Sequence, residues 1–273
     1  EEKKELPPLP GAERGKVKVR LPPEPNGYLH IGHALSFMLN YLYARRYDGK
    51  VVLKLEDTNP LKEKPEFYAA IIRDVKWLGI DWDELFIISE HFGELEKLAE
   101  KLIKKKKAYV CTCELEKVRE RRAKLEADPC RGHSKSENLE LWEEMKAGER
   151  FILRWLGDPK AANSVMRDPT LYRVLDVTHP WTGVNHVIYP TYDFANACTD
   201  GMLGITHVLR SEEFLQRTEL HVAIMNALGF KPPEYIHYGR FELEGTPTSK
   251  RLIRPLVEKQ IVKGWDDPRL ATL

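Results

Sequence analysis

The sequence predicts an α/β protein with a doubly wound parallel sheet that an insertion divides into two halves. Strand-like and helical patterns alternate twice between residues 17 and 78, which is typical of βαβ units and a parallel sheet. The same alternation returns after about residue 188, beyond a stretch with a different pattern. A nucleotide-binding fold split by an insertion is the simplest organisation that accounts for both observations.

The predicted elements of the first half are a strand, a helix, a strand and a helix, over residues 17–21, 29–47, 51–55 and 67–78. Pro22-Pro23 end the first strand, because proline cannot donate to a ladder. The last helix is marked by apolar residues spaced four, four and three apart, at Phe67, Ile71, Val75 and Leu78. Later segments are helical near 95–102, 139–145 and 212–228, and strand-like near 151–153, 186–189 and 236–243.

These elements group into five predicted parts: a flexible leader (1–14), the first half of the nucleotide-binding domain (15–92), an α+β insertion (93–187), the second half (188–251) and the start of a connecting region (252–273). Apolar residues make up 42% of the 273, and charged residues 31%. Without a signal peptide or an apolar run long enough for a bilayer, we expect a cytoplasmic protein with no membrane partner. The net charge of +1 argues neither for nor against nucleic acid, and the Lys104–Lys107 run also suits a helix end.

The stretch P-N-G-Y-L-H-I-G-H contains His30 and His33 at the turn between the first strand and helix. Zinc-binding histidines on one helix are usually four apart and need a third ligand, which is not evident nearby. Packing in the core would not explain the surrounding turn. Gly32 allows close approach to backbone N–H groups at the start of a helix. We therefore interpret this stretch as a phosphate-binding turn.

A second cationic segment, Gly245 to Arg251, contains Ser249 and Lys250 in a loop with glycine and proline. Such a loop can move, and its cations suit a phosphate chain. By itself it is weak evidence, because many surface loops look like it. Combined with the histidine turn, it predicts a nucleotide site.

At these motifs the sequence resembles the class I aminoacyl-tRNA synthetases, in their glutamate/glutamine branch. The resemblance extends over residues 16–273, and the chain has Thr248 where the family usually has Met. The matching blocks are Pro22–His33, Leu55–Pro60, Val165–Pro169, Tyr189–Phe194, Gly204–His207, Thr248–Arg251 and, typical of archaeal and eukaryotic members, Gly264–Arg269.

The resemblance implies a Rossmann-type catalytic domain with an acceptor-stem-binding insertion. It also implies a two-step reaction, in which ATP activates an amino acid that is then transferred to the 3′ end of tRNA. His30, His33, Ser249 and Lys250 would stabilise charge on the phosphates. The implied ATP-binding residues are Pro23, Gly32, His33, Arg240 and Lys250, with Mg²⁺ as the phosphate counter-ion.

The amino-acid site implied by the resemblance consists of Arg20, Glu56, Tyr192 and Arg210. Glu56 suits an α-ammonium group, and Arg210 suits a γ-carboxylate, which a guanidinium binds with two hydrogen bonds. The resembled glutamine enzymes have a small uncharged residue at the position of Arg210 and an Asp at that of Glu56. We therefore expect glutamate as substrate and tRNA(Glu) as partner, with tRNA(Gln) the alternative. The competing interpretation of Arg210 is a surface arginine that begins the next helix.

Cys111, Cys113, Cys130 and His133 form a C-x-C…C-x-x-H pattern, which matches a structural Cys₃His zinc set. The other interpretation is three reduced cysteines beside a surface histidine. Related glutamyl enzymes often carry zinc in this insertion, although the spacing here departs from the usual forms. Cys198 is expected to be a small buried hydrophobe.

Full-length relatives continue into an anticodon-binding region, which we expect to be absent from this chain. Four alternatives to a glutamate enzyme remain. The first is a glutaminyl or dual-specificity enzyme, and the second is the short paralogue that glutamylates a tRNA base. The third is a docking module without enzymatic activity, which would not need His30, His33 and Lys250. The fourth is a non-synthetase nucleotidyltransferase with the same histidine turn, which would not need Tyr192-Asp193-Phe194 or Arg210.

Overall fold

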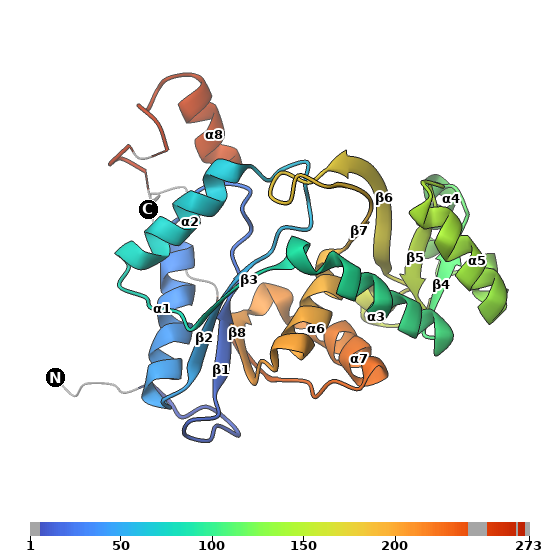
Figure 1. The fold of residues 1–273 in the computed structure, drawn as a ribbon, viewed down its shortest axis with the longest axis horizontal. Coiled ribbons are helices and arrows are strands. Elements are labelled where there is room, and N and C mark those ends of the chain that lie inside the picture. Colours follow the sequence, from blue (N-terminus) through green and yellow to red (C-terminus); the bar gives the residue numbers. More distant parts are fainter. Residues whose placement is uncertain (1–5, 240–249, 266, 271–273) are drawn as a thin grey trace.

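The protein has a parallel-sheet part and an antiparallel-sheet part that lie end to end (Figure 1). The structure, a computed structural model, describes residues 6–239, 250–265 and 267–270, without the side chains of Lys250 and Arg251. Among the helices of these residues, none has the length and apolar character needed to cross a membrane.

The parallel part consists of two groups of strands that meet at β1 and β8. Its strands are β1 (Lys18–Leu21), β2 (Lys50–Leu55), β3 (Glu84–Ile87), β8 (His207–Ser211) and β9 (Glu234–Tyr238). The first three pair in the order β1-β2-β3, and β8 pairs with β9. The N–H of Thr206 donates to the carbonyl of Lys18 at 2.9 Å, which places the start of β8 beside β1. The order of strands reverses at this junction, and ligands bind beyond the carboxyl ends of strands at such a point.

Helices cover both faces of the sheet. They are α1 (Ile31–Arg46) and α2 (Pro65–Trp77) on one face, and α6 (Tyr192–Leu203) and α7 (Thr218–Leu228) on the other. The side chains of strand β2 are apolar on both faces of the sheet. Val51 and Leu53 belong to the apolar cluster of α1 and α2, whereas Val52 belongs to the cluster of α6 and α7. Successive side chains of a strand point to opposite faces, so a doubly covered strand is apolar on both. The predicted doubly wound fold is confirmed.

The insertion contains an antiparallel sheet in the order β4-β5-β6-β7. Its strands are β4 (Ala108–Cys111), β5 (Ile152–Trp155), β6 (Thr170–Thr178) and β7 (Asn185–Pro190), and its helices are α3 (Phe92–Lys104), α4 (Leu115–Ala123) and α5 (Lys135–Lys146). The apolar cluster of this sheet is continuous with that of α6 and α7. Strand β7 crosses the predicted boundary at residues 187/188, because its pairing with β6 extends to Pro190.

Two expectations need correction. Part of the predicted leader is docked on the protein: Leu9 is buried, its N–H donates to the Tyr47 hydroxyl at 3.0 Å, and the Tyr43 hydroxyl donates to the carbonyl of Pro7. The aromatic residues of α1 and its C-terminal end hold this segment, a contact that local sequence does not reveal. The helix predicted over 212–228 is divided into a 3₁₀ helix, Glu212–Arg217, followed by α7. The remaining helix is α8 (Lys250–Glu258).

Candidate functional site

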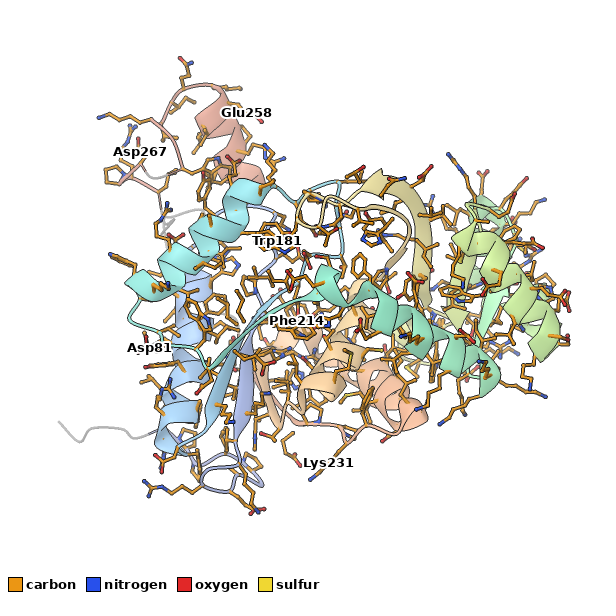
Figure 2. The ribbon with its side chains drawn as sticks, in the orientation of Figure 1. Asp81, Trp181, Phe214, Lys231, Glu258 and Asp267 are labelled. Carbon is orange, nitrogen blue, oxygen red and sulfur yellow. The ribbon has the colours of Figure 1, made fainter. Side chains whose placement is uncertain are left out.

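A cleft of about 740 Å³ opens at the carboxyl ends of β1 and β8. It is the place where the strand order reverses, and charged, aromatic and small residues all line it. Phe214, labelled in Figure 2, is one of its walls. The remaining lining residues are Arg20, Pro22, Glu24, Asn26, His30, Gly32, His33, Ser36, Phe37, Glu56, Tyr192, Leu209, Arg210, Ser211, Glu213, Arg217 and Tyr238.

The two predicted histidines cap the start of α1 reciprocally. His30 is the N-cap residue, and its Nδ1 accepts from the N–H of Gly32 at 3.1 Å. His33, three positions later, accepts from the N–H of His30 through its own Nδ1 at 3.2 Å. This is a capping box in which imidazoles replace the usual hydroxyl and carboxylate. Because both Nδ1 atoms accept, the proton of each neutral ring is on Nε2, which becomes a donor.

Gly32 is required by the same geometry. A Cβ on this residue would lie 2.9 Å from Cε1 and 3.0 Å from Nδ1 of His30. A side chain would therefore displace the ring that caps the helix. The absence of a side chain on Gly32 leaves room for the ring of His30. His30 and His33 then present their Nε2–H donors at the positive end of α1.

Behind the cleft, four charged side chains form a buried network. Arg20 Nε donates to Asp200 at 3.2 Å, and Lys54 Nζ donates to the other oxygen of Asp200 at 2.6 Å. Lys54 is fully buried and also lies 3.4 Å from Glu56 Oε1. Burial alone would raise the pKa of Asp200, but Lys54 and Arg20 hold it below its ordinary value. The positive charges of Arg20 and Lys54 are thus balanced by the carboxylates of Glu56 and Asp200, and buried charges are tolerated only when they are paired in this way.

Lys54 and Asp200 were not predicted as part of the site. The signal for Lys54 was a single cation inside an otherwise apolar strand, at a position that faces α6. Asp200 lies in the middle of a helix whose residues are mostly buried. Polar residues in such places indicate a partner across the core, but the sequence does not say which one.

Glu56 ends this network at the cleft. It is 5% exposed, and its buried Oε1 forms no hydrogen bond among the described residues but pairs with the Lys54 ammonium at 3.4 Å. Burial raises the pKa of its carboxyl, against the opposing influence of Lys54 and Arg20. Glu56 also lines the cleft, where its carboxylate can accept a hydrogen bond from a ligand. An ammonium group fits these requirements.

Arg210, in β8, is a buried cation that uncharged groups hold. Its Nη2 donates to the Thr218 hydroxyl at 2.7 Å, its Nη1 lies 3.5 Å from His221 Nδ1, and its Nε lies 3.4 Å from His237 Nε2. Its guanidinium carbon lies 4.8 Å from the centre of the Tyr235 ring. No carboxylate of the described residues forms an ion pair with it. Burial lowers the pKa of Arg210, since the charge is desolvated without a neutralising partner.

Tyr192 begins α6 and lines the same cleft. Burial raises the pKa of its hydroxyl, so that it remains a neutral donor. The structure therefore brings the predicted amino-acid set to the same cleft, which is lined by Arg20, Glu56, Tyr192 and Arg210.

The predicted ATP set is only partly described. His33 and Gly32 line the cleft, whereas Pro22 rather than Pro23 does so at the preceding turn. The carbonyl of Pro23 instead accepts from the N–H of Glu56 at 2.9 Å, which joins the turn after β1 to the end of β2. Arg240 and Ser249 lie outside the described residues, as does the side chain of Lys250.

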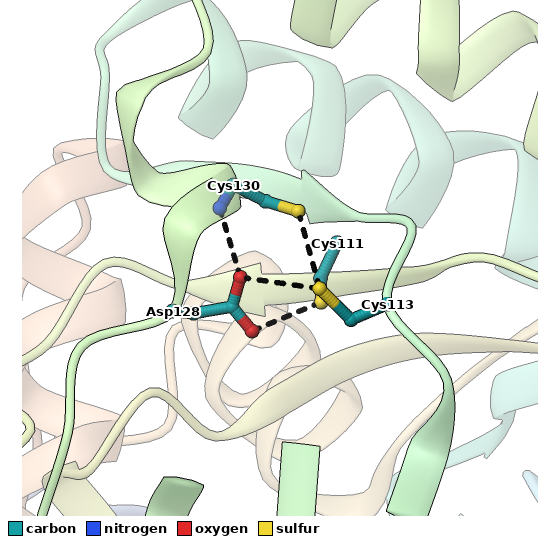
Figure 3. Close-up of side chains that lie close together, drawn as sticks. All are labelled: Cys111, Cys113, Asp128 and Cys130. Carbon is teal, nitrogen blue, oxygen red and sulfur yellow. Dashed lines mark hydrogen bonds between the residues drawn. The ribbon is translucent and has the colours of Figure 1, made fainter. Parts of the chain in front are cut away.

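The predicted cysteines meet between β4 and the turn Pro129–Gly132 (Figure 3). Candidate ligand atoms of Cys111, Cys113, Cys130 and Asp128 all lie within 4.8 Å of one another. Cys113 Sγ and Cys130 Sγ are 3.7 Å apart. Tetrahedral zinc with Zn–S bonds of about 2.3 Å requires a sulfur–sulfur distance of about 3.8 Å. A donor set of three thiols and one carboxylate therefore fits zinc.

The fourth group at this site is Asp128 and not the expected His133. Nε2 of His133 faces the Glu137 carboxylate at 3.6 Å, because His133 ends the 3₁₀ turn and is directed toward α5. Asp128 accepts from the thiol of Cys111 at 3.1 Å and from the backbone N–H of Cys130 at 2.9 Å. Arg154 also donates to it at 2.7 Å, which keeps it ionised within the cluster.

Comparison with known proteins agrees with this geometry. Residues 16–273 match the family model of tRNA synthetases class I (E and Q), catalytic domain. The glutamate–tRNA ligases of Korarchaeum cryptofilum and Nitrosopumilus maritimus are each 45% identical to the chain, over 289 and 277 residues that include 100% of it. The match covers 51% and 48% of those proteins, so the chain spans about half their length.

A solved structure is also similar. The glutamate tRNA ligase from Elizabethkingia meningosepticum, in complex with its amino acid, gives a TM-score of 0.63 at 25% identity, covering 86% of this chain and 52% of that one. With the family model matched over nearly the whole chain and relatives at 45% identity, the chain belongs to the class I tRNA synthetases for glutamate and glutamine (E and Q), within their catalytic domain.

Proposed function

We propose that this chain carries the catalytic centre of a glutamate–tRNA ligase, which activates glutamate with ATP and transfers it to the 3′ end of tRNA(Glu) in the cytoplasm. The observation that carries the proposal is Arg210: a buried guanidinium, held by neutral groups, in the cleft that also contains the histidine turn. A substrate γ-carboxylate would supply the missing negative charge.

In the first step, the α-carboxylate of glutamate attacks the α-phosphorus of ATP and releases pyrophosphate. Nε2–H of His30 and His33, with the N–H groups at the start of α1, would donate to phosphate oxygens as charge develops. Lys250 and Ser249 are proposed to contact the pyrophosphate, and Arg240 to contact ATP. Mg²⁺ would enter with ATP as the counter-ion of its phosphates.

The amino acid would be held at both ends. Glu56 accepts from the α-ammonium, with Arg20 and Lys54 fixing the position of the carboxylate network. Arg210 binds the γ-carboxylate, and Tyr192 donates from its neutral hydroxyl. Proteins accelerate such displacements mainly through this kind of positioning.

Glutamate is favoured over glutamine because of what glutamine would leave unpaired. An amide offers Arg210 a neutral oxygen and cannot neutralise its charge, while its NH₂ group would face a group that has only donors. Leaving a buried charge unpaired costs several kcal/mol. The relatives named glutamate–tRNA ligase support the same choice. Use of tRNA(Gln) has no comparable support.

The insertion is proposed to contact the acceptor end of tRNA, and its cysteine cluster to hold a structural zinc ion. Cys111, Cys113, Cys130 and Asp128 would be the ligands. Zinc would supply a cross-link between β4 and the turn that precedes α5, in a region with few apolar side chains of its own.

ATP–pyrophosphate exchange with glutamate and with glutamine, each with and without tRNA, tests the proposal. We expect exchange with glutamate. Exchange with glutamine alone would contradict the assignment of Arg210, and no exchange under any condition would favour a docking module over an enzyme.

A further inference from the structure

The loop that follows β2, residues 57–63, lies directly after Glu56 and contacts the insertion. The contact is made by the turn between β6 and β7, residues 179–184, which reaches toward the start of α2 (Figure 1). In Figure 2 the labelled Trp181 marks this turn between the two parts of the molecule.

His179 is the centre of the contact and is 0% exposed. Its Nδ1 faces the N–H of Trp181 at 3.2 Å and therefore accepts, which places the ring proton on Nε2. Nε2 lies 2.9 Å from the carbonyl oxygen of Asp57 and donates to it. Glu63 Oε2 lies 3.4 Å from the same nitrogen. One imidazole thus connects the backbone of the insertion turn to the residue after Glu56.

Two further contacts act on the same loop. Nη2 of Arg173, in β6, donates to the carbonyl of Thr58 at 3.5 Å. Trp181 stacks on Tyr68, with ring centres 4.7 Å apart, and the Tyr68 hydroxyl donates to Asp57 Oδ2 at 2.9 Å. The insertion therefore supplies donors to two successive carbonyls of the loop and packs against the side chain that holds its carboxylate.

From the side of the sheet, Asp57 is anchored by Ser89. The backbone N–H of Ser89 donates at 2.9 Å and its hydroxyl at 2.6 Å. Asp57 is thus fixed on both sides, and the planar peptide unit that joins it to Glu56 restrains the backbone of Glu56 as well. A small displacement of the insertion turn would be transmitted to the carboxylate of Glu56.

We propose that His179 is a positioning residue through which the insertion sets the geometry of Glu56 and thereby the affinity for the amino acid. This inference rests on the proposed function, in which Glu56 accepts from the α-ammonium of glutamate. It adds that the part of the molecule proposed to contact tRNA also controls the amino-acid site.

The test is ATP–pyrophosphate exchange, with the KM values of glutamate and ATP measured separately for His179→Phe and His179→Gln. Phenylalanine retains the aromatic contacts with Phe92 and Tyr189 but has no donor. We expect the KM of glutamate to rise on the order of tenfold and that of ATP to stay within about twofold. The glutamine amide can donate where Nε2 does, so His179→Gln should restore most of the affinity.

His186 provides a matched control. Its ring packs in the same aromatic cluster on the neighbouring strand, and its Nε2 has no hydrogen-bond partner among the described residues. His186→Phe should leave both KM values unchanged. Arg173→Met, which removes the donor to Thr58 without changing the buried imidazole, should raise the KM of glutamate by a smaller factor, about threefold.

An unchanged KM of glutamate in His179→Phe would overturn the inference while leaving the proposed function intact. If that variant does not fold, Arg173→Met decides, and an unchanged KM there has the same meaning. A wild-type chain that shows no exchange with glutamate, with or without tRNA, would overturn the proposed function, and the inference with it.

Discussion

Arg210 and His221 face each other beside the cleft, with Nη1 of Arg210 at 3.5 Å from Nδ1 of His221. A guanidinium has only donors, so Nδ1 accepts and the ring proton remains on Nε2, which lies 3.0 Å from Asp193 Oδ1. His221 is thus a neutral spacer between Arg210 and Asp193. Arg217 pairs with the same carboxylate at 2.6 Å. The negative charge of Asp193 is therefore committed to His221 and Arg217.

A carboxylate placed next to Arg210 should weaken the preference of the site for glutamate over glutamine. Thr218 is the position at which to introduce it, because the Thr218 hydroxyl accepts from Nη2 of Arg210 at 2.7 Å. We expect Thr218→Asp to raise the KM of glutamate on the order of a hundredfold, because the new carboxylate would neutralise the guanidinium of Arg210. The ratio of kcat/KM for glutamate to that for glutamine should fall for the same reason. Thr218→Ser, which keeps the hydroxyl, is the control. The measurement is amino-acid-dependent ATP–pyrophosphate exchange, and an unchanged KM in Thr218→Asp would contradict the role of Arg210.

The affinity for glutamate should fall in acidic solution because of His221, and only at pH values below the ordinary histidine pKa of 6.5. Burial lowers the pKa of this histidine below its ordinary value of 6.5, and Arg210 lowers it further. The folded chain therefore binds the proton less readily than the unfolded chain, so this group's contribution to stability is lost as pH falls below 6.5. Once the ring is protonated, Nδ1 no longer accepts from Arg210.

The test compares pH profiles of the KM of glutamate. Asparagine at position 221 can accept where Nδ1 does and does not titrate, so His221→Asn should flatten the acidic limb of the profile. An identical acidic limb in wild type and His221→Asn would assign the pH dependence to another group.

The parts of the fold that the sequence predicted are those with a local signal. The apolar spacing of α2 and the prolines after β1 depend on neighbours within a few residues. The pair Lys54–Asp200 is 146 residues apart in the chain, and each partner is an isolated polar residue in an apolar element. Nothing local shows that one neutralises the other, because the contact exists only once α6 covers the sheet.

The cysteine cluster shows a different limit. Spacing identified the three thiols correctly as neighbours, but it could not decide between Asp128 and His133 as the fourth group. Both flank the short turn Pro129–Gly132, but Asp128 meets the thiols whereas His133 faces Glu137. Which one faces the thiols depends on the path of the backbone through this turn and on the pairing of Asp128 with Arg154.

An alanine in place of Gly32 should disturb catalysis more than binding of the amino acid. Its Cβ would lie 2.9 Å from His30 Cε1, so the ring must turn away and lose the hydrogen bond that defines its proton position. We expect kcat to fall on the order of tenfold to a hundredfold, with the KM of glutamate unchanged.

Gly93, in α3, is the matched control, because a Cβ there would meet nothing within 4 Å. Gly93→Ala should keep full activity and gain about 0.4–1 kcal/mol in the free energy of unfolding, because alanine lowers the conformational entropy of the unfolded chain. Equal activity in Gly32→Ala and wild type would show that the position of the His30 ring does not matter for the reaction.

Zinc, if bound as proposed, should be present at one ion per chain and depend on Asp128 more than on His133. Burial raises the pKa of the Cys111 and Cys130 thiols, so without metal these thiols stay protonated, and binding should release protons and weaken as pH falls. We expect Cys111→Ser to abolish binding, and His133→Ala to retain it with an unchanged melting temperature. Asp128→Asn should weaken binding on the order of tenfold to a hundredfold.

Metal analysis of dialysed protein, together with melting curves before and after chelation, provides the measurement. Asp128→Asn also loses the charge that pairs with Arg154, so its stability must be compared in the metal-free state. A metal-free wild type that melts at the same temperature with and without added zinc would leave the cluster as three reduced cysteines held by a carboxylate.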